Sequence, residues 1–143
     1  MSIHQISVFL ENRVGQLAEI TDLLAKNNID IRAISIAETA DYGVARLIVD
    51  DCTQASAILL EHGDILSMTP VWAVEVPDRP AGLSELLCTL AQAHVDIAYM
   101  YSLFTHKDGH AYMVLRISNE EAFTKAMAEH DIKIVGKAEL GLK

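Results

Sequence analysis

Residues 11–31 read ENRVGQLAEITDLLAKNNIDI, and residues 78–97 read DRPAGLSELLCTLAQAHVDI. A shift of 66 residues superposes the first half of the chain on the second without a gap from residue 12 to residue 50. Ten of these 39 positions are identical, namely Arg13/Arg79, Leu17/Leu83, Glu19/Glu85, Leu24/Leu90, Ala25/Ala91, Asp30/Asp96, Ile31/Ile97, Thr39/Thr105, Gly43/Gly109 and Ala45/Ala111. The pattern indicates that one unit occurs twice.

The period of the repeat bounds the domain organisation. It matches a small α+β domain and is far too long for a heptad or a solenoid unit. We predict a first domain over residues 1–69 and a second over residues 70–143 of the 143-residue chain. Such small domains bury little surface, so the halves are expected to share a core or a continuous sheet. No room is left for a separate catalytic domain.

Hydrophobic periodicity predicts one order of elements in both copies. In the first copy, strands are expected at residues 3–10, 30–39, 44–50 and 65–69, with helices at 16–27 and 53–62, the latter capped near Asp51. In the second copy, strands are expected at residues 71–76, 96–105, 110–117 and 132–137. One helix follows the loop at residues 78–82, and a capping box of Ser118 and Glu121 predicts the start of the other.

The predicted order in each half is βαββαβ, with only Pro70 between the halves. This is the ferredoxin-like α+β arrangement, an antiparallel sheet with two helices on one face. A sheet covered on one face should alternate apolar and polar residues, but several strands here are apolar in both parities. We assign the excess of apolar residues to the sheet face away from the helices. This face is formed by Val44, Arg46 and Ile48 in the first copy and by Ala98, Met100, Ser102 and Phe104 in the second. Another sheet or another chain is expected to cover it, and an isologous homodimer is the most frequent closed solution.

The two quoted stretches resemble the loop-helix-strand motif of ACT domains. The motif is essentially Asn/Asp-Arg-Pro-Gly-x-Leu before a helix, followed by x-Ile/Val-Asp-Ile, and it occurs here twice in matching register. The resemblance covers residues 3–136, and the chain as a whole is similar to small tandem ACT proteins. It implies two βαββαβ modules that bind a free amino acid between ACT units, with a metabolic enzyme as a further partner.

The residue chemistry of the loop favours the same kind of ligand. A tight turn before a helix leaves the first backbone N–H groups unpaired, and the helix dipole favours an anion such as an α-carboxylate. Asn12 and Asp78 could accept a bond from a ligand ammonium, and Asp30 and Asp96 are expected at the same end of the fold. The predicted ligand-binding residues are Asn12, Arg13, Val14, Gly15, Gln16, Leu17, Asp30, Ile31, Asp78, Arg79, Pro80, Ala81, Gly82, Leu83, Asp96 and Ile97. The alternative is that Asn12 and Asp78 simply cap the helices.

The two loops differ at the motif positions. The first has Val14 in place of proline and keeps Gly15, whereas the second keeps Pro80 but has Ala81 before Gly82. Alanine disfavours positive φ, so the second loop is expected to have a different shape. The first copy is therefore favoured as the competent site.

Composition and motifs exclude several other classes of function. The net charge is −9, which argues against nucleic acid and anionic membranes as partners. Cys52 and Cys88 fall at non-equivalent positions and are read as free thiols of a cytoplasmic protein. No catalytic, cofactor or metal motif is present, although His106 and His110 flank a turn. The prediction is a non-catalytic amino acid sensor, and the alternative is a constitutive interaction subunit that uses ACT units only to oligomerise.

Overall fold

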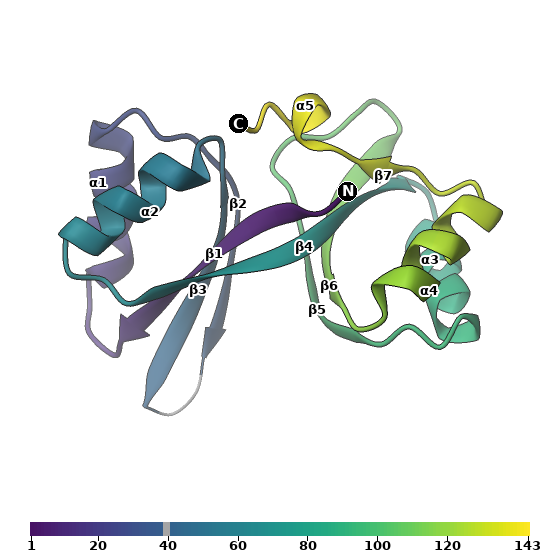
Figure 1. Ribbon diagram of the computed structural model, residues 1–143, viewed down its shortest axis with the longest axis horizontal. Helices are drawn as coiled ribbons and strands as arrows, with labels where there is room; N and C mark the ends of the chain where they lie inside the picture. Colours follow the sequence, from purple (N-terminus) through teal and green to yellow (C-terminus); the bar gives the residue numbers. More distant parts are fainter. Residues whose placement is uncertain (39–40) are drawn as a thin grey trace. The chain divides into compact units, whose positions relative to one another are not determined.

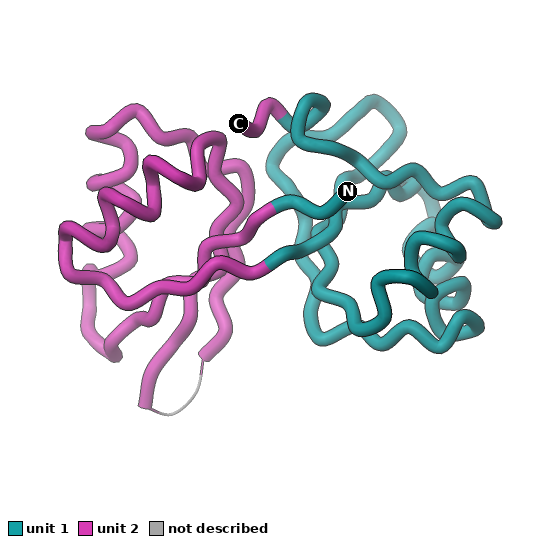
Figure 2. Tube along the Cα trace, viewed as in Figure 1, with its two compact units in different colours: residues 1–3, 70–140 teal, residues 4–69, 141–143 magenta. Residues whose placement is uncertain are grey.

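The computed structural model describes residues 1–38 and 41–143. These residues form two compact units, shown in different colours in Figure 2. Unit 2 comprises His4–Thr69 with Gly141–Lys143, and unit 1 comprises Pro70–Leu140 with Met1–Ile3. Apart from the two chain ends, unit 2 is the first sequence copy and unit 1 is the second.

Unit 2 has the predicted βαββαβ order (Figure 1). Its elements are β1 (Ile3–Glu11), α1 (Gln16–Lys26), β2 (Ile31–Glu38), β3 (Tyr42–Val49), α2 (Cys52–Glu61) and the first part of β4 (Leu66–Pro77). Strand β3 is central, because it pairs antiparallel with β1 on one side and with β2 on the other. Thr39, which matches Thr105 in the sequence repeat, lies outside the described residues.

Unit 1 repeats this order from the second part of β4 onward. Its further elements are α3 (Gly82–Gln92), β5 (Ile97–Ser102), β6 (His110–Ile117), α4 (Glu120–Glu129), β7 (Ile134–Val135) and α5 (Lys137–Leu140). Strand β4 pairs antiparallel with both β6 and β7, and β5 pairs with β6. The last strand is shorter than predicted, and helix α5 was not predicted.

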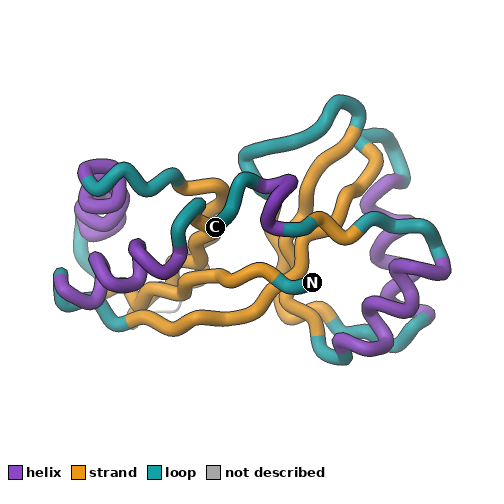
Figure 3. The backbone as a smooth tube through the Cα atoms, turned by 45° about the horizontal axis from the view of Figure 1, so that its top comes forward, coloured by secondary structure: helices purple, strands orange, loops and turns teal. Residues whose placement is uncertain are grey.

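Helices α1 and α2 lie on one face of the strands of unit 2, and helices α3 and α4 lie on one face of the strands of unit 1 (Figure 3). In unit 2 the core joins Ile20 and Leu24 of α1 to Leu47 of β3, all fully buried. In unit 1 Leu90 and Phe123 pack with Trp72, whose ring centroid lies 5.2 Å from that of Phe123. Burial of each such side chain contributes roughly 1.5–3 kcal/mol, so each unit has its own apolar core. The predicted α+β fold is confirmed.

Pro70 does not interrupt the chain between two strands, as the sequence had suggested. It lies inside the 12-residue strand β4, is exposed, and accepts a hydrogen bond through its carbonyl from Arg116 Nη1 at 2.9 Å. Proline fixes φ near a value that extended backbone tolerates and removes only one N–H donor. The prediction of two strands separated at Pro70 is therefore wrong.

The difference in residue number between equivalent positions of the two copies changes at the β-hairpin. Ile6 of β1 pairs with Leu47, and Trp72 of β4 pairs with Leu115. The shift is therefore 66 residues before the hairpin but 68 after it. Gly43 lies inside β3, whereas Gly109 lies in the turn before β6. The gapless alignment through residue 50 is wrong beyond the hairpin, and the identities Gly43/Gly109 and Ala45/Ala111 do not mark equivalent positions.

The assignment of the outer sheet face in the second copy is also wrong. Met100 pairs opposite Leu115 and packs against the helix-side core. A register irregularity between Ile97 and Tyr99 shifts the alternation of β5, because one extra residue exchanges the two faces of a strand. Tyr101, paired with Val114, therefore lies on the face away from the helices.

Helix α4 begins differently from the prediction. Its N-cap is Asn119, whose side chain accepts a hydrogen bond from Ala122 N at 3.1 Å. Ser118 Oγ instead accepts from Asp96 N at 3.0 Å, which joins the start of β5 to the end of β6. The capping box of Ser118 and Glu121 is therefore absent, since the serine hydroxyl is used between strands.

Candidate functional site

Both predicted loops end at a left-handed residue that begins a helix. Gly15 has φ 90° and ψ −8° before α1, and Ala81 has φ 72° and ψ −8° before α3. No side chain caps either helix, whereas Asp51 and Asn119 cap α2 and α4. The alternative in which Asn12 and Asp78 cap the helices does not apply.

The last residue of the loop has the same backbone conformation in both copies, contrary to the expectation from sequence. Ala81 adopts the positive φ that glycine adopts in the first copy. An L-residue pays a steric cost there, and the fixed ends of β4 and α3 hold Ala81 in place. The conformation of this residue therefore does not favour the first copy over the second as a ligand site.

The glycine of the second loop has another use. A Cβ on Gly82 would lie 2.1 Å from the carbonyl oxygen of Pro77, so only glycine fits at the start of α3. The equivalent residue in unit 2 is Gln16, which is 8% exposed, and its Oε1 has no hydrogen-bond partner. Helix α3 therefore approaches its preceding strand more closely than a side chain allows.

Each loop arginine is tied to the first turn of its own helix. Arg13 Nη2 lies 2.8 Å from Glu19 Oε2, and Arg79 Nη2 lies 2.8 Å from Glu85 Oε2. The hydrogen bond from Arg13 lowers the pKa of Glu19 below its ordinary value, and the same bond raises the pKa of Arg13. The identical pairs of the repeat thus form the same bridge twice. Glu19 and Glu85 are identical in the two sequence copies, but their pairing with the loop arginines was not predicted.

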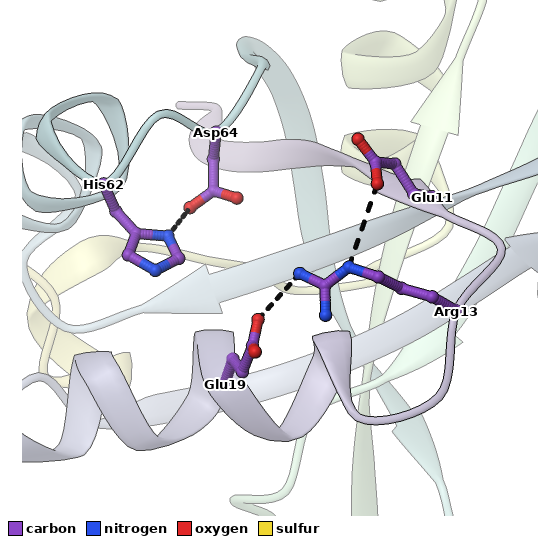
Figure 4. Close-up of polar contacts among 5 residues, drawn as sticks. All are labelled: Glu11, Arg13, Glu19, His62 and Asp64. Atoms are coloured by element: carbon purple, nitrogen blue, oxygen red, sulfur yellow. Dashed lines mark hydrogen bonds and ion pairs between the residues drawn. The ribbon is translucent and has the colours of Figure 1, made fainter.

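Unit 2 extends its bridge into a larger polar cluster, drawn in Figure 4. Arg13 Nε also lies 3.8 Å from Glu11 Oε2, and nearby His62 Nδ1 lies 2.9 Å from Asp64 Oδ2. In unit 1, the shift of 66 places Pro77 at the position of Glu11. The shift of 68 places His130 and Ile132 at the positions of His62 and Asp64. Two of the three acids of the cluster are therefore replaced by apolar residues in unit 1.

Asp30 and Asp96 were predicted to lie at the loop end of their units, but the structure places them at the other end. In unit 2, Glu11 at the loop pairs with Tyr42, whereas Ile31 pairs with Val49 at the opposite end of β3. Helix α1 carries the chain back along the sheet, so the residues after it lie far from those before it. Asp30 N donates to Asp50 Oδ1 at 2.9 Å, as Asp96 N does to Ser118 Oγ.

The remaining residues predicted to bind a ligand fall into an exposed group and a partly buried group. All four loop residues before each helix are exposed, and Leu83 is exposed as well. Leu17, Ile31 and Ile97 are partly buried. Among residues 1–38 and 41–143, no three His, Cys, Asp or Glu side chains are grouped to hold a metal ion. None of the helices in the same residues is long and apolar enough to cross a membrane.

A family model described as an ACT domain pair matches residues 1–142. The chain belongs to the ACT domain pair family. The structure of protein BT0572 from Bacteroides thetaiotaomicron is 35% identical with a TM-score of 0.91, covering 99% of this chain and 96% of that chain. No curated protein sequence matches the chain significantly.

A similar fold occurs in regulatory subunits of aspartate kinase. The regulatory subunit of aspartate kinase from Thermus thermophilus, in its ligand-free form, has a TM-score of 0.66 and 16% identity over 90% of this chain and 91% of that chain. The corresponding subunit from Thermus flavus has a TM-score of 0.60 and 18% identity, covering 90% of each chain. At these identities the likeness is one of fold.

Proposed function

We propose that this ACT domain pair is a regulatory protein that senses a free amino acid and has no catalytic activity of its own. The main support is the pair of uncapped helix N-termini, each behind an exposed loop and a left-handed residue. Free N–H groups at a helix start, together with the helix dipole, suit the α-carboxylate common to all amino acids. At α2 and α4 a side-chain cap already takes one of these donors, Gln54 N and Ala122 N respectively.

The ligand-binding residues of this proposal are the loop residues of both copies. Asn12 and Asp78 are exposed beside the loops and could accept bonds from a ligand ammonium. Arg13 and Arg79 are engaged by Glu19 and Glu85, so their role in this proposal is to fix the loop shape. Asp30, Ile31, Asp96 and Ile97 would contribute only by completing a site formed with a loop of another ACT unit.

The regulated partner in this proposal is a metabolic enzyme. Proteins of the same fold include regulatory subunits of aspartate kinase. An amino acid can shift the shape or assembly of such a complex only through different affinities for its two states.

Thermal shift with each of the twenty amino acids at millimolar concentration tests the proposal. One or two amino acids should raise the melting temperature of the wild type. The increase should be reduced in Asn12→Ala or Asp78→Ala, depending on which loop binds, and kept in the control Asp22→Asn on the outer surface of α1. An absence of any shift, with the protein folded, contradicts the sensor.

The second candidate function is a constitutive interaction subunit. Leu83 is 44% exposed on α3, and neighbouring Cys88 and Ala91 are exposed and uncharged. An uncharged helix surface of this kind is suited to a protein contact. Under this alternative no amino acid binds, and an enzyme subunit is held whether or not amino acids are present.

A further inference from the structure

Unit 1 contains a cavity next to its loop. The volume of this cavity is about 510 Å³, within the range of small-molecule pockets. Pro77 and Gly82, the two residues that flank loop residues 78–81, both line it. Glu85 and Gln92 also line it and are exposed, so the cavity is open to solvent there. A molecule bound at the N-terminus of α3 therefore lies beside an open cavity.

The floor of the cavity is apolar. Val76 and Leu86 are buried members of the core on the helix side of the sheet, and Ile132 is partly buried against that core. Leu86 lies four residues after Gly82 in α3, a rise of about 6 Å along the helix axis. A depth of this order suits an aliphatic side chain of the size of leucine.

The charged groups of the lining do not belong to this floor. Glu75 and Pro77 alternate with Val76 along β4, and Pro77 pairs with His110 of β6. Successive side chains of a strand point to opposite faces, so Glu75 and His110 lie on the sheet face opposite Val76. The Glu75 carboxylate is there 3.3 Å from Lys107 Nζ. The ionisable lining residues that are exposed to solvent are Glu85, His130, Asp131 and Lys133.

The equivalent positions of unit 2 are polar. By the shifts of 66 and 68 residues, Gln16 takes the place of Gly82, and Asp64 takes the place of Ile132. Gln16 is buried, and the Asp64 side chain is only 8% exposed, with its Oδ2 2.9 Å from His62 Nδ1 (Figure 4). A carboxylate beside an aliphatic chain loses hydration without gaining a hydrogen bond. The apolar floor is therefore a feature of unit 1.

We propose that the amino acid sensed at the loop of unit 1 has an aliphatic side chain, which enters this cavity and packs against Val76, Leu86 and Ile132. This inference rests on the proposed function, because the N-terminus of α3 is taken to hold the α-carboxylate. The cavity then selects the side chain. A charged side chain would lose hydration against the apolar floor, and the methyl group of alanine would bury little apolar surface.

The probes for this proposal are L-alanine, L-2-aminobutyrate, L-norvaline and L-norleucine, each longer than the one before by a single CH₂ group. Calorimetric titration at millimolar concentrations should give affinities that rise about fourfold with each CH₂, as expected for burial of apolar surface. L-aspartate and L-lysine should bind more weakly than L-norleucine. In NMR spectra, L-norleucine should shift the methyl signals of Val76, Leu86 and Ile132.

Ile132→Asp gives unit 1 the residue that unit 2 has at this position, and it should abolish the gain in affinity from L-alanine to L-norleucine. The matched control is Ala128→Asp, which adds the same charge at an exposed position of α4 outside the cavity. It should keep the full gain. Should Ile132→Asp fail to fold, the methyl shifts of the wild type with L-norleucine still decide.

The outcomes separate this proposal from the sensor itself. An affinity that does not rise from L-alanine to L-norleucine overturns the aliphatic side chain and leaves an amino acid sensor in place. The same holds if folded Ile132→Asp keeps the full gain, or if L-norleucine binds without shifting the three methyl signals. If no amino acid binds at all, the proposed function fails together with this inference.

Discussion

At the scale of single residues, the two loops show how one backbone shape is reached by different side chains. Gly15 and Ala81 both take positive φ before a helix. Nothing lies within 4 Å of a Cβ added to Gly15, so the cost of alanine there is one of backbone conformation alone. The positive φ is thus common to both copies, although Ala81 carries a Cβ that Gly15 lacks.

Replacing Ala81 with glycine should stabilise the protein. The left-handed conformation costs an L-residue about 1–2 kcal/mol, and part of that gain is lost because glycine is freer when unfolded. Ala81→Gly should therefore raise the free energy of unfolding by up to about 1 kcal/mol, measured by urea denaturation. Gly15→Ala should lower it by about as much.

Ala91→Gly is the matched control, because Ala91 is an exposed residue within α3. It should lower the free energy of unfolding by about 1 kcal/mol. Equal destabilisation by Ala81→Gly and Ala91→Gly would mean that Ala81 is not strained.

At the scale of elements, the bridge between each loop and its helix has a consequence for pH. The pKa of Glu19 is lowered by its hydrogen bond with Arg13. A lowered folded-state pKa contributes stability above the ordinary glutamate pKa, and this contribution is lost as pH falls through the lowered value. Arg13→Gln should return the pKa of Glu19 toward its ordinary value, as followed by NMR titration of its carboxyl carbon.

The matched control for this titration is Arg79→Gln, which removes the equivalent arginine from unit 1. It should leave the pKa of Glu19 unchanged, since Arg79 pairs with Glu85. A Glu19 titration that is the same in wild type and Arg13→Gln would show that the bridge is not formed in solution.

The start of α4 provides a second test at this scale. Asn119→Ala removes the side-chain cap and should cost about 1 kcal/mol of stability. Glu121→Ala removes the glutamate of the capping box that the sequence predicted with Ser118. Because this box is not formed, the free energy of unfolding should change by less than about 0.5 kcal/mol. Chemical denaturation of both variants distinguishes the two caps, and a larger loss from Glu121→Ala would favour the box.

At the scale of the whole molecule, assembly is the main open prediction. Several apolar side chains are exposed, among them Phe104 at 61%, Ile36 at 46% and Tyr42 at 43%. Burial of such side chains between two copies is favourable, and an isologous dimer is the most frequent arrangement. Light scattering at micromolar concentration should give twice the chain mass of 15.7 kDa, and a mass that stays at one chain on concentration would rule the dimer out.

The duplicated βαββαβ order could be predicted from the amino-acid sequence alone. The 3.6-residue period of α1 and α3 and the alternation in the strands are local properties, and duplication repeated each signal. The cap of α2 at Asp51 was predicted for the same reason, since a cap depends on residues three apart in the chain.

The equivalence of residues between the two copies became clear only from the strand pairing in three dimensions. Strand pairing sets the shift of 68 after the hairpin, and it separates Gly43 from Gly109 despite their identity. Asp30 likewise lies at the opposite end of the sheet from its loop. Register depends on partners distant in sequence, which residue types alone do not specify.

The structural role of Gly82 was also invisible in the sequence. It depends on the carbonyl oxygen of Pro77, which would lie 2.1 Å from a Cβ at this position. Sequence assigned Gly82 to a loop that binds a ligand, but in the structure its missing Cβ allows a close approach between helix and strand. Such an approach is fixed by packing in three dimensions, because no local pattern records what a side chain would meet.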